Sequence, residues 1–232
     1  MAIARPVSAL LTQVIDAHGG LARWNENEKV DATIVSGGGF FPLKGVVQDS
    51  EPRRMTVWLH EQRSSVLPFG APDQLTMLTP SRIAIQKLDG TVVAERRDPR
   101  DSFVGHQMSS QWDALHLGYF NGEALWTYFT TPFLLTMEGV VVEETEPWSE
   151  GDETWRVLRA TSRGQSIRTV WFKTSSLIMT SDCGATITAS ILQAVSPHRN
   201  SLPTTSWRTA FIYLPNGAPT RAARDAGRSW TC

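Results

Sequence analysis

One aromatic stretch, residues 101–135, separates two long series of short segments in which apolar and polar residues alternate. Within this stretch, between residues 111 and 130, apolar and aromatic side chains recur every three or four positions, which predicts a helical segment. The flanking segments, at about 30–96 and about 139–214, have the period of two that is typical of β-strands. This order predicts a strand-rich α+β protein with an aromatic helix in the middle of its sequence.

The helical segment contains two glycines, Gly118 and Gly122, each of which costs a helix about 1 kcal/mol relative to alanine. Glycines four residues apart share one helix face, so they would let another part of the backbone come close. Pro132 should end the helix near Thr131, because the residue before a proline disfavours the helical conformation. Asp113 is expected in the first turn, where a carboxylate favours the helix dipole. An alternative role for Asp113 is to orient a histidine.

An N-terminal helix is predicted over residues 8–18 from apolar side chains at helical spacing. Ser8 is expected to cap its start and Gly19 and Gly20 to end it, with a short second helical turn around Trp24. The face that should pack on a sheet carries Leu10, Leu11, Val14, Ile15 and His18.

The strand-like segments are joined by short polar links, which predicts antiparallel neighbours because a parallel crossover needs a dozen or more residues. Residues 41–48 are expected to form one of these strands, and Asp89 with Gly90 a tight hairpin turn. In the strand near residue 57, Met55, Val57 and Leu59 should share one face, and Thr56, Trp58 and His60 the other. The sequence shows no linker, so we expect a single domain over 1–232 that ends in a polar tail at 216–232.

The composition excludes several classes of function. The formal net charge is -1, from 22 basic and 23 acidic residues, which gives no electrostatic basis for nucleic-acid binding. No apolar run is long enough to span a membrane, and no secretory signal is evident, so we expect a cytoplasmic protein. The two cysteines, Cys183 and Cys232, fit no zinc site; reduced thiols are expected, and one bridge between them stays open. The sequence gives no indication of the oligomeric state.

Two groups of motifs resemble a known family. They are AHGGLARW at 17–24, and SFVGH at 102–106 followed by WDALHLGYF at 112–120 and ALWTYFTTPF at 124–133. Together they resemble a family of uncharacterised soluble bacterial proteins whose architecture is similar to the lipoprotein carriers of the LolA/LolB type. The resemblance implies a strongly curved antiparallel sheet, an open half-barrel, with helices covering its concave face and an apolar cavity between them. The lack of an export signal argues against the cellular task of those carriers.

His106, Tyr119 and Tyr128 are the candidate catalytic residues, because imidazole and phenol groups can polarise a carbonyl or move a proton. His106 could instead cap a helix or bind a loop carbonyl, His116 could face solvent, and the aromatic stripe could be core. The side chains expected to line a ligand site are Trp58, His60, Phe103, Trp112, His116, Trp126, Phe133, Trp171 and Trp207.

The chain has no G-x-G-x-x-G motif, no P-loop and no G-x-S-x-G elbow, and its five histidines show no metal-ligand spacing. We therefore expect no cofactor and no metal. The first hypothesis is a cofactor-independent enzyme, such as an isomerase, cyclase or lyase of small-molecule biosynthesis, that holds a lipophilic molecule in an apolar pocket. The second is a non-catalytic carrier of a hydrophobic ligand or lipid. A third, a purely structural or protein-interaction module, predicts that no cavity exists.

Overall fold

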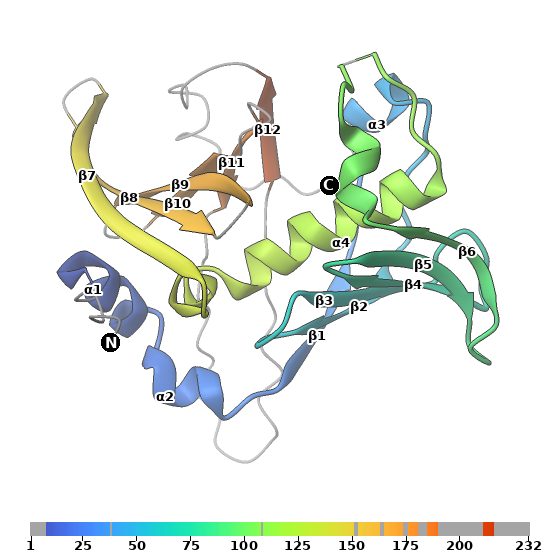
Figure 1. Cartoon of the computed structure of the whole chain (residues 1–232), viewed down its shortest axis with the longest axis horizontal. Helices are drawn as coiled ribbons and strands as arrows, with labels where there is room; N and C mark the ends of the chain where they lie inside the picture. Colours follow the sequence, from blue (N-terminus) through green and yellow to red (C-terminus); the bar gives the residue numbers. More distant parts are fainter. Residues whose placement is uncertain are drawn as a thin grey trace. The chain divides into compact units, whose positions relative to one another are not determined.

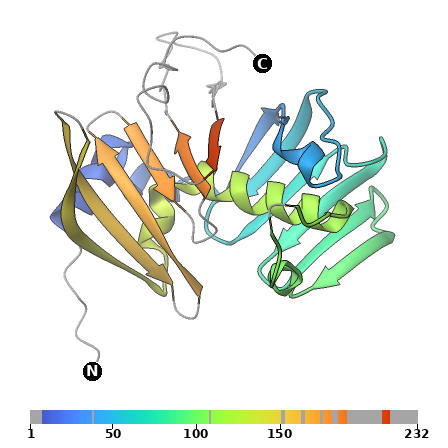
Figure 2. The same cartoon turned by 90° about the horizontal axis from the view of Figure 1, so that it is seen from above.

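The computed structural model describes residues 8–37, 39–107, 109–150, 153–162, 165–173, 176–180, 185–189 and 211–215. The chain divides into two compact units: Leu21–Leu134, which we call the central unit, and Met1–Gly20 with Leu135–Cys232, which we call the terminal unit. Each unit contains a six-stranded antiparallel sheet (Figures 1 and 2). The α+β class and the antiparallel pairing are confirmed, and the single domain over 1–232 stays a prediction.

The sheet of the central unit is a meander in which each strand pairs with the next one along the chain. Short turns produce this order, and the β5–β6 turn places Gly90 at a φ of 89°, a left-handed conformation that suits glycine. The predicted hairpin at Asp89 and Gly90 is thus confirmed. The strands are β1 (Lys29–Ile34), β2 (Arg53–Trp58), β3 (Arg63–Leu67), β4 (Gln74–Thr79), β5 (Arg82–Lys87) and β6 (Val92–Arg97).

The helix α4 (Ala114–Thr130) packs on one face of this sheet, mainly against β3, β4 and β5. The sheet residues on that face are buried, and Ser64 Oγ donates a hydrogen bond of 3.1 Å to the carbonyl oxygen of Gly122. A Cβ atom at Gly122 would lie 2.9 Å from Leu78 Cδ2, and one at Gly118 would lie 3.2 Å from Thr76 Cγ2. The two glycines therefore permit the close approach that their spacing predicted, here against sheet side chains.

The expectation that residues 41–48 form a strand is wrong. Residues Phe40–Leu43 form the short helix α3, followed by a turn in which Gly45 has a φ of 71°. Pro42 has no N–H to give to a strand ladder, and its fixed φ suits a helical turn. Phe41 is buried in this helix and packs with Phe69, Ile85 and Leu117.

The terminal unit contains α1 (Ala9–Ala17), which begins near residue 8 and ends at the left-handed glycines Gly19 and Gly20, as predicted. The expected cap is wrong in detail: the Ser8 side chain makes no capping hydrogen bond. Leu10, Leu11, Val14 and Ile15 are buried as expected. The predicted second helical turn is α2 (Gly20–Asn25), and a 3-10 turn, η2 (Phe133–Thr136), lies at the other junction of the units.

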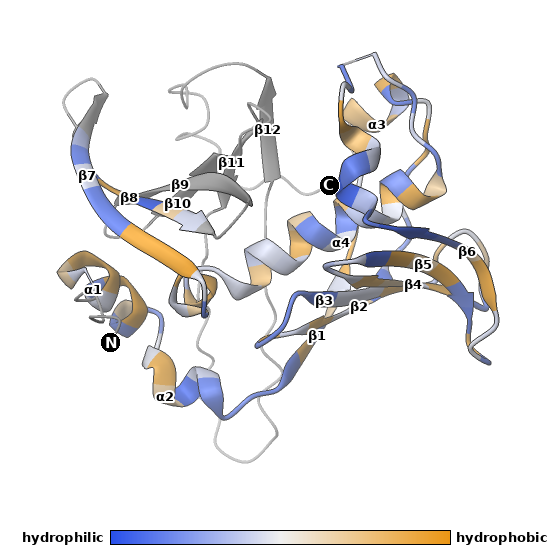
Figure 3. Cartoon of the chain, in the orientation of Figure 1, coloured by the Kyte–Doolittle hydropathy of each residue, from blue (hydrophilic) through white to orange (hydrophobic). Residues whose placement is uncertain are grey.

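The sheet of the terminal unit also follows chain order, from β7 outward to β12. The strand β7 begins with an apolar stretch (Figure 3), and the neighbouring β8 buries Val157, Leu158 and Ala160. Arg156 binds Glu144 on β7 at 2.7 Å and Gln13 on α1 at 3.3 Å. The strands are β7 (Val140–Glu150), β8 (Glu153–Ser162), β9 (Gln165–Lys173), β10 (Ser176–Thr180), β11 (Ala185–Ala189) and β12 (Phe211–Pro215).

The strong curvature expected of a half-barrel is wrong for the described strands, since neither sheet is strongly curled. The reason lies in the number of strands per sheet. Open, twisted sheets usually curl only when they approach about ten strands. Here the strands are divided between two sheets of six, and α4 covers one face of the first sheet.

Some predictions concern residues outside the described ranges. They include Trp207, Cys183, Cys232, His198 and the tail at 216–232. Within those ranges, the longest and most apolar helices still fall short of what a bilayer crossing requires.

Candidate functional site

Eight aromatic rings at the start of α4 and in the two segments beside it form one connected group, which we call the aromatic cluster. Neighbouring ring centroids lie 4.9 to 6.1 Å apart, within the range of favourable edge-to-face and tilted contacts. The cluster rests on the buried core formed by Phe69, Ile85 and Leu117. Its members are Phe40, Phe41, Phe103, His106, Trp112, His116, Tyr119 and Phe120.

Backbone hydrogen bonds fix the two segments that carry the cluster. The Trp112 N–H donates to the Lys44 carbonyl at 2.8 Å, which joins the segment after α3 to the segment before α4. Gly45 has a φ of 71°, a conformation that side-chain-bearing residues rarely adopt, and the end of the Gln111 side chain packs against it. The 3-10 turn η1 (Pro99–Phe103) then brings Phe103 under the start of α4.

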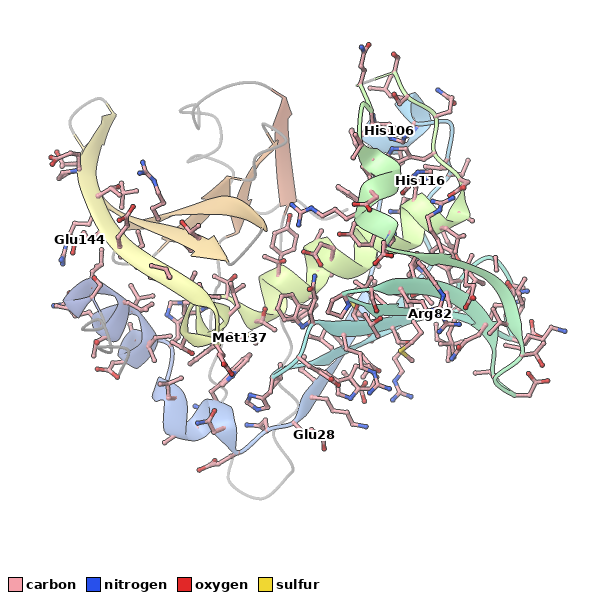
Figure 4. The ribbon with its side chains drawn as sticks, viewed as in Figure 1. Glu28, Arg82, His106, His116, Met137 and Glu144 are labelled. Carbon is pink, nitrogen blue, oxygen red and sulfur yellow. The ribbon has the colours of Figure 1, made fainter. Side chains whose placement is uncertain are left out.

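Phe103 lies at the centre of the half of the cluster that contains both histidines. Its ring centroid is 5.5 Å from that of His106 and 4.9 Å from that of His116. The two imidazole centroids are 5.1 Å apart, and the residues lie side by side in Figure 4. The chain thus brings together two titratable rings separated by ten positions in sequence.

Asp113 orients His116. Its Oδ1 accepts a hydrogen bond from the His116 N–H at 2.8 Å, which caps α4, and the same oxygen lies 2.8 Å from His116 Nδ1. The Asp113 N–H also lies 3.3 Å from Nδ1, but Nδ1 cannot both donate to the carboxylate and accept from the amide. The shorter contact to a charged oxygen is the stronger one. We therefore assign the proton to Nδ1, which leaves a lone pair on Nε2 of the neutral ring.

The Asp113 carboxylate is held in its charged form. Burial raises its pKa, but the hydrogen bond from Arg96, the His116 N–H and the nearby positive charges outweigh burial and lower the pKa to about 2. Arg96 on β6 supplies the main partner, with Nη2 2.6 Å from Oδ2. Arg96, Asp113 and His116 therefore form a chain that leads from the edge of the sheet to the aromatic cluster.

Three nitrogens of the cluster are buried and have no hydrogen-bond partner among the described atoms. They are Nδ1 of His106, Nε1 of Trp112 and Nε2 of His116. Each such group costs about 1 to 3 kcal/mol, and native structures contain few of them. Their concentration in one cluster makes it the candidate site of the central unit.

Lys44 adds a buried positive charge to the same cluster. Its relative exposure is 5 %, and Nζ donates to the Gln107 carbonyl at 2.8 Å. Nζ also lies 5.4 Å from the ring centroids of Phe40 and Trp112, within cation–π distance. Within the described part of the chain, no carboxylate forms an ion pair with it. Burial lowers the pKa of Lys44.

The structure gathers five of the sequence-predicted site residues and separates the others. Those that meet in the cluster are Phe103, His106, Trp112, His116 and Tyr119. Trp126 lies ten residues beyond His116 on α4, a rise of about 15 Å. Its indole N–H donates to the carbonyl oxygens of Trp58 and Glu61, at 2.9 and 2.8 Å, so its role there is structural.

The remaining candidates lie away from the cluster or outside the described side chains. His60 is exposed and binds the Asn27 carbonyl at 2.8 Å, and Phe133 stacks on Trp24 with ring centroids 4.2 Å apart. As predicted, Trp58 alternates with the buried Met55 and Val57, which places it on the sheet face opposite α4. Tyr128 lies in the last turns of α4, nine residues beyond Tyr119. Trp171 lies in β9, and Trp207 is not among the described residues.

Sequence reasoning missed Lys44, Arg96, Phe40, Phe41 and Phe120. Phe41, Lys44 and Arg96 lie in segments expected as strands, and Phe40 directly precedes one, so nothing in the sequence placed them beside the helical segment. A hint was available in Phe40 and Phe41 beside Pro42, because adjacent aromatic residues at a helix-compatible proline suit a short packed helix better than an alternating strand.

Neither a metal site nor similarity to a known protein explains what the aromatic cluster does. No group of three or more His, Cys, Asp or Glu side chains capable of holding a metal occurs in the ranges the structure describes. Comparisons with models of known protein families, with curated proteins and with solved structures each found no match. The likeness to the LolA/LolB-type carriers therefore rests on the sequence motifs alone, and the function must be argued from the site.

Proposed function

We propose that the central unit binds a lipophilic small molecule at the aromatic cluster and catalyses a cofactor-independent proton transfer on it, as an isomerase or cyclase does. The observation that carries this proposal is the pair of buried, unpartnered nitrogens, His106 Nδ1 and His116 Nε2, on rings 5.1 Å apart. Groups with this chemistry, concentrated in an apolar setting, mark candidate active sites.

His116 is the better candidate for the base. The charged Asp113 carboxylate holds Nδ1–H, so the Nε2 lone pair is directed into the aromatic cluster. A carboxylate that fixes the tautomer of a histidine in this way also stabilises the imidazolium formed when the histidine takes a proton. His106, whose ring centroid lies 5.1 Å from that of His116, is positioned to donate or share a proton with the same bound molecule.

The reaction class follows from these groups. Nε2 of His116 would remove a proton from a carbon next to a carbonyl, and the electron pair of the C–H bond would move onto the carbonyl oxygen as an enolate. The proton would then return to another atom of the same molecule, so no oxidant, reductant or co-substrate is required. Such general acid–base steps contribute about 10²- to 10⁴-fold to a rate.

The aromatic rings support a lipophilic ligand. Leu43 and Val104, which adjoin Lys44 and Phe103 along the chain, are 59 % and 82 % exposed, and Val47, three residues after Lys44, is 88 % exposed. Apolar side chains exposed around a buried polar group are typical of sites for small hydrophobic molecules. The alternative function, a non-catalytic carrier of a hydrophobic ligand or lipid, uses the same features and is what the resemblance to the LolA/LolB-type proteins implies.

Exchange of carbon-bound hydrogen for deuterium distinguishes the two functions. A panel of bicyclic ketones that includes 2-tetralone is incubated with the protein in deuterated buffer, and both binding and loss of the α-hydrogen signals are followed by proton NMR. We expect the wild-type protein to accelerate exchange of at least one bound ketone and His116→Gln to lose the acceleration. His60→Gln, which changes an exposed histidine away from the cluster, should retain it.

The experiment distinguishes an enzyme, a carrier and a structural protein. Binding without accelerated exchange would favour the carrier. Equal exchange with His116→Gln and the wild-type protein would remove His116 as the base. A panel of which no member perturbs the signals of the cluster residues would contradict both functions and favour a structural role.

A further inference from the structure

Lys44 and Trp112 form a second polar feature of the aromatic cluster that proton transfer by the histidines does not use. Nζ of Lys44 lies 5.4 Å from the Trp112 ring centroid, and the backbone of the two residues is joined by the 2.8 Å hydrogen bond from the Trp112 N–H to the Lys44 carbonyl. Nε1 of Trp112 is buried and lacks a partner within the described residues. Both side chains can only donate hydrogen bonds.

The charge on Lys44 is under-compensated. An ammonium removed from water is costly unless it is paired, and here it has one carbonyl oxygen and two ring faces as described partners. The N–H of the Trp112 ring that Lys44 contacts adds a further unsatisfied donor. A group that supplies negative oxygen atoms would satisfy both donors at once, since charged hydrogen bonds are stronger than neutral ones.

We propose that the ligand of this site is a lipophilic carboxylic acid, whose carboxylate binds Lys44 Nζ and Trp112 Nε1 while its apolar body lies against the aromatic cluster. This inference rests on the proposed function in one respect, that the cluster binds a lipophilic molecule, and it names the class to which that molecule belongs. Catalysis by His116 is not needed for it to hold.

The ring contacts limit how far the ligand must extend. Phe103 contacts both Trp112 and His116, with ring centroids 5.6 Å from the first and 4.9 Å from the second. A molecule anchored by its carboxylate at Trp112 and Lys44 would therefore have at most about two ring contacts to span before it reaches His116. Binding energy from the remote acid group would position the reacting carbon at the imidazole.

The test uses three probes with the same bicyclic body: naphthalene-2-carboxylate, naphthalene-2-carboxamide and 2-methylnaphthalene. Dissociation constants are measured at neutral pH by titration of the indole N–H signals in proton–nitrogen NMR spectra, with the Trp112 signal assigned from Trp112→Phe. We expect the carboxylate to bind the wild-type protein about ten-fold or more tightly than the carboxamide. Lys44→Met, which keeps an unbranched side chain one atom shorter and removes the charge, should abolish this preference.

A matched control uses Lys87→Met, because Lys87 is an exposed lysine at the end of β5 in the same unit. It should leave the preference unchanged, which separates a local hydrogen bond from a general charge effect. Circular dichroism and the unfolding transition of each variant confirm that it is folded.

Two results would overturn the inference: equal affinity for the carboxylate and the carboxamide, or an undiminished preference in folded Lys44→Met. Neither result depends on deuterium exchange at His116, so the inference and the catalytic proposal fail separately. A carboxylate preference that disappears in Lys44→Met without any exchange activity would identify a carrier of lipophilic acids.

Discussion

Oδ1 of Asp113 lies 2.8 Å from Nδ1 of His116, and it also accepts the His116 backbone N–H at 2.8 Å. One carboxylate oxygen therefore performs two tasks, because it caps α4 and fixes the histidine side chain in that helix's first turn. The capping fixes the start of the helix, and the start of the helix fixes where Nε2 points. Local structure and candidate chemistry are linked through this one residue.

The two tasks separate in a pair of variants. Asp113→Asn keeps a good N-cap side chain, whereas Asp113→Ala removes it, so we expect the alanine variant to be less stable than the asparagine variant by about 1 kcal/mol. Both variants lose the charged partner of His116, so both should lose accelerated ketone exchange. Urea unfolding and the exchange assay measure the two effects. An asparagine variant that retains full exchange would contradict the orienting role.

The pH dependence of stability provides a second check on Asp113. Its pKa in the folded protein is about 2, below the ordinary value of 3.8, so the charged form favours folding. This contribution is complete above about pH 5 and is lost as the pH falls toward 2. Because the side chain is half exposed, solvent screening limits it to about 1 kcal/mol.

The comparison of wild type with Asp113→Asn isolates this term. Other aspartates with lowered pKa values, such as Asp31, are common to both proteins and cancel in the difference. The stability advantage of the wild-type protein over the asparagine variant should shrink between about pH 5 and pH 2. An advantage that stays constant across this range would show that Asp113 is not ionised preferentially in the folded state.

The close contact of α4 with its sheet predicts an order for two glycine substitutions. Gly122→Ala would place a Cβ 2.9 Å from both Leu78 Cδ2 and Ser64 Oγ, so about 1 to 3 kcal/mol of overpacking should exceed the gain of about 1 kcal/mol in helix propensity. Gly118→Ala, with its nearest neighbour at 3.2 Å, should be tolerated better. Thermal unfolding of both variants tests the order, and a Gly122→Ala protein more stable than Gly118→Ala would refute this packing.

Most of the sheet in the central unit was predictable, because several of its strands alternate and most are joined by short turns. Met55 and Val57 are buried and Thr56 and Trp58 are less so, as the period of two requires. The helical segment was predictable for a similar reason, since its apolar residues recur at helical spacing and Pro132 follows it. Local periodicity therefore predicted the strands and the long helix of this unit, although it failed at α3.

The site was only partly predictable, because it depends on contacts between segments distant in sequence. Lys44 and Trp112 are joined by a backbone hydrogen bond although they lie 68 positions apart in the chain. No local pattern in either segment predicts that the two meet. Conversely, Trp126 matched the aromatic pattern but lies about 15 Å along the helix from His116. Its N–H donates to two backbone carbonyls there, away from the aromatic cluster. Residue type suggested candidates, and only the fold separated them.

Removing the charge of Lys44 and removing that of Arg53, two buried cations of the central unit, should change the stability of the protein in opposite directions. Lys44 has one described hydrogen bond, so Lys44→Met should leave stability unchanged or raise it by up to about 1 kcal/mol. Arg53 is also buried, but it donates to Ser36 and Gln48 at 3.0 and 3.2 Å. Arg53→Met removes both hydrogen bonds, although Gln48 keeps those it exchanges with Asn121, and should cost about 1 to 3 kcal/mol. Urea unfolding of both variants measures this, and a strongly destabilised Lys44→Met would assign Lys44 a structural role.

We infer that Nε2 of His116 presents a lone pair to a molecule bound at the aromatic cluster. Long-range proton–nitrogen NMR of the histidine side chains measures this directly, with His116 assigned from His116→Gln. We expect a proton on Nδ1 and none on Nε2, together with a change in the His116 Nε2 signal, and not in that of His60, when naphthalene-2-carboxylate or 2-tetralone is added. A proton found on Nε2 instead, or a His116 signal that neither probe shifts, would contradict it.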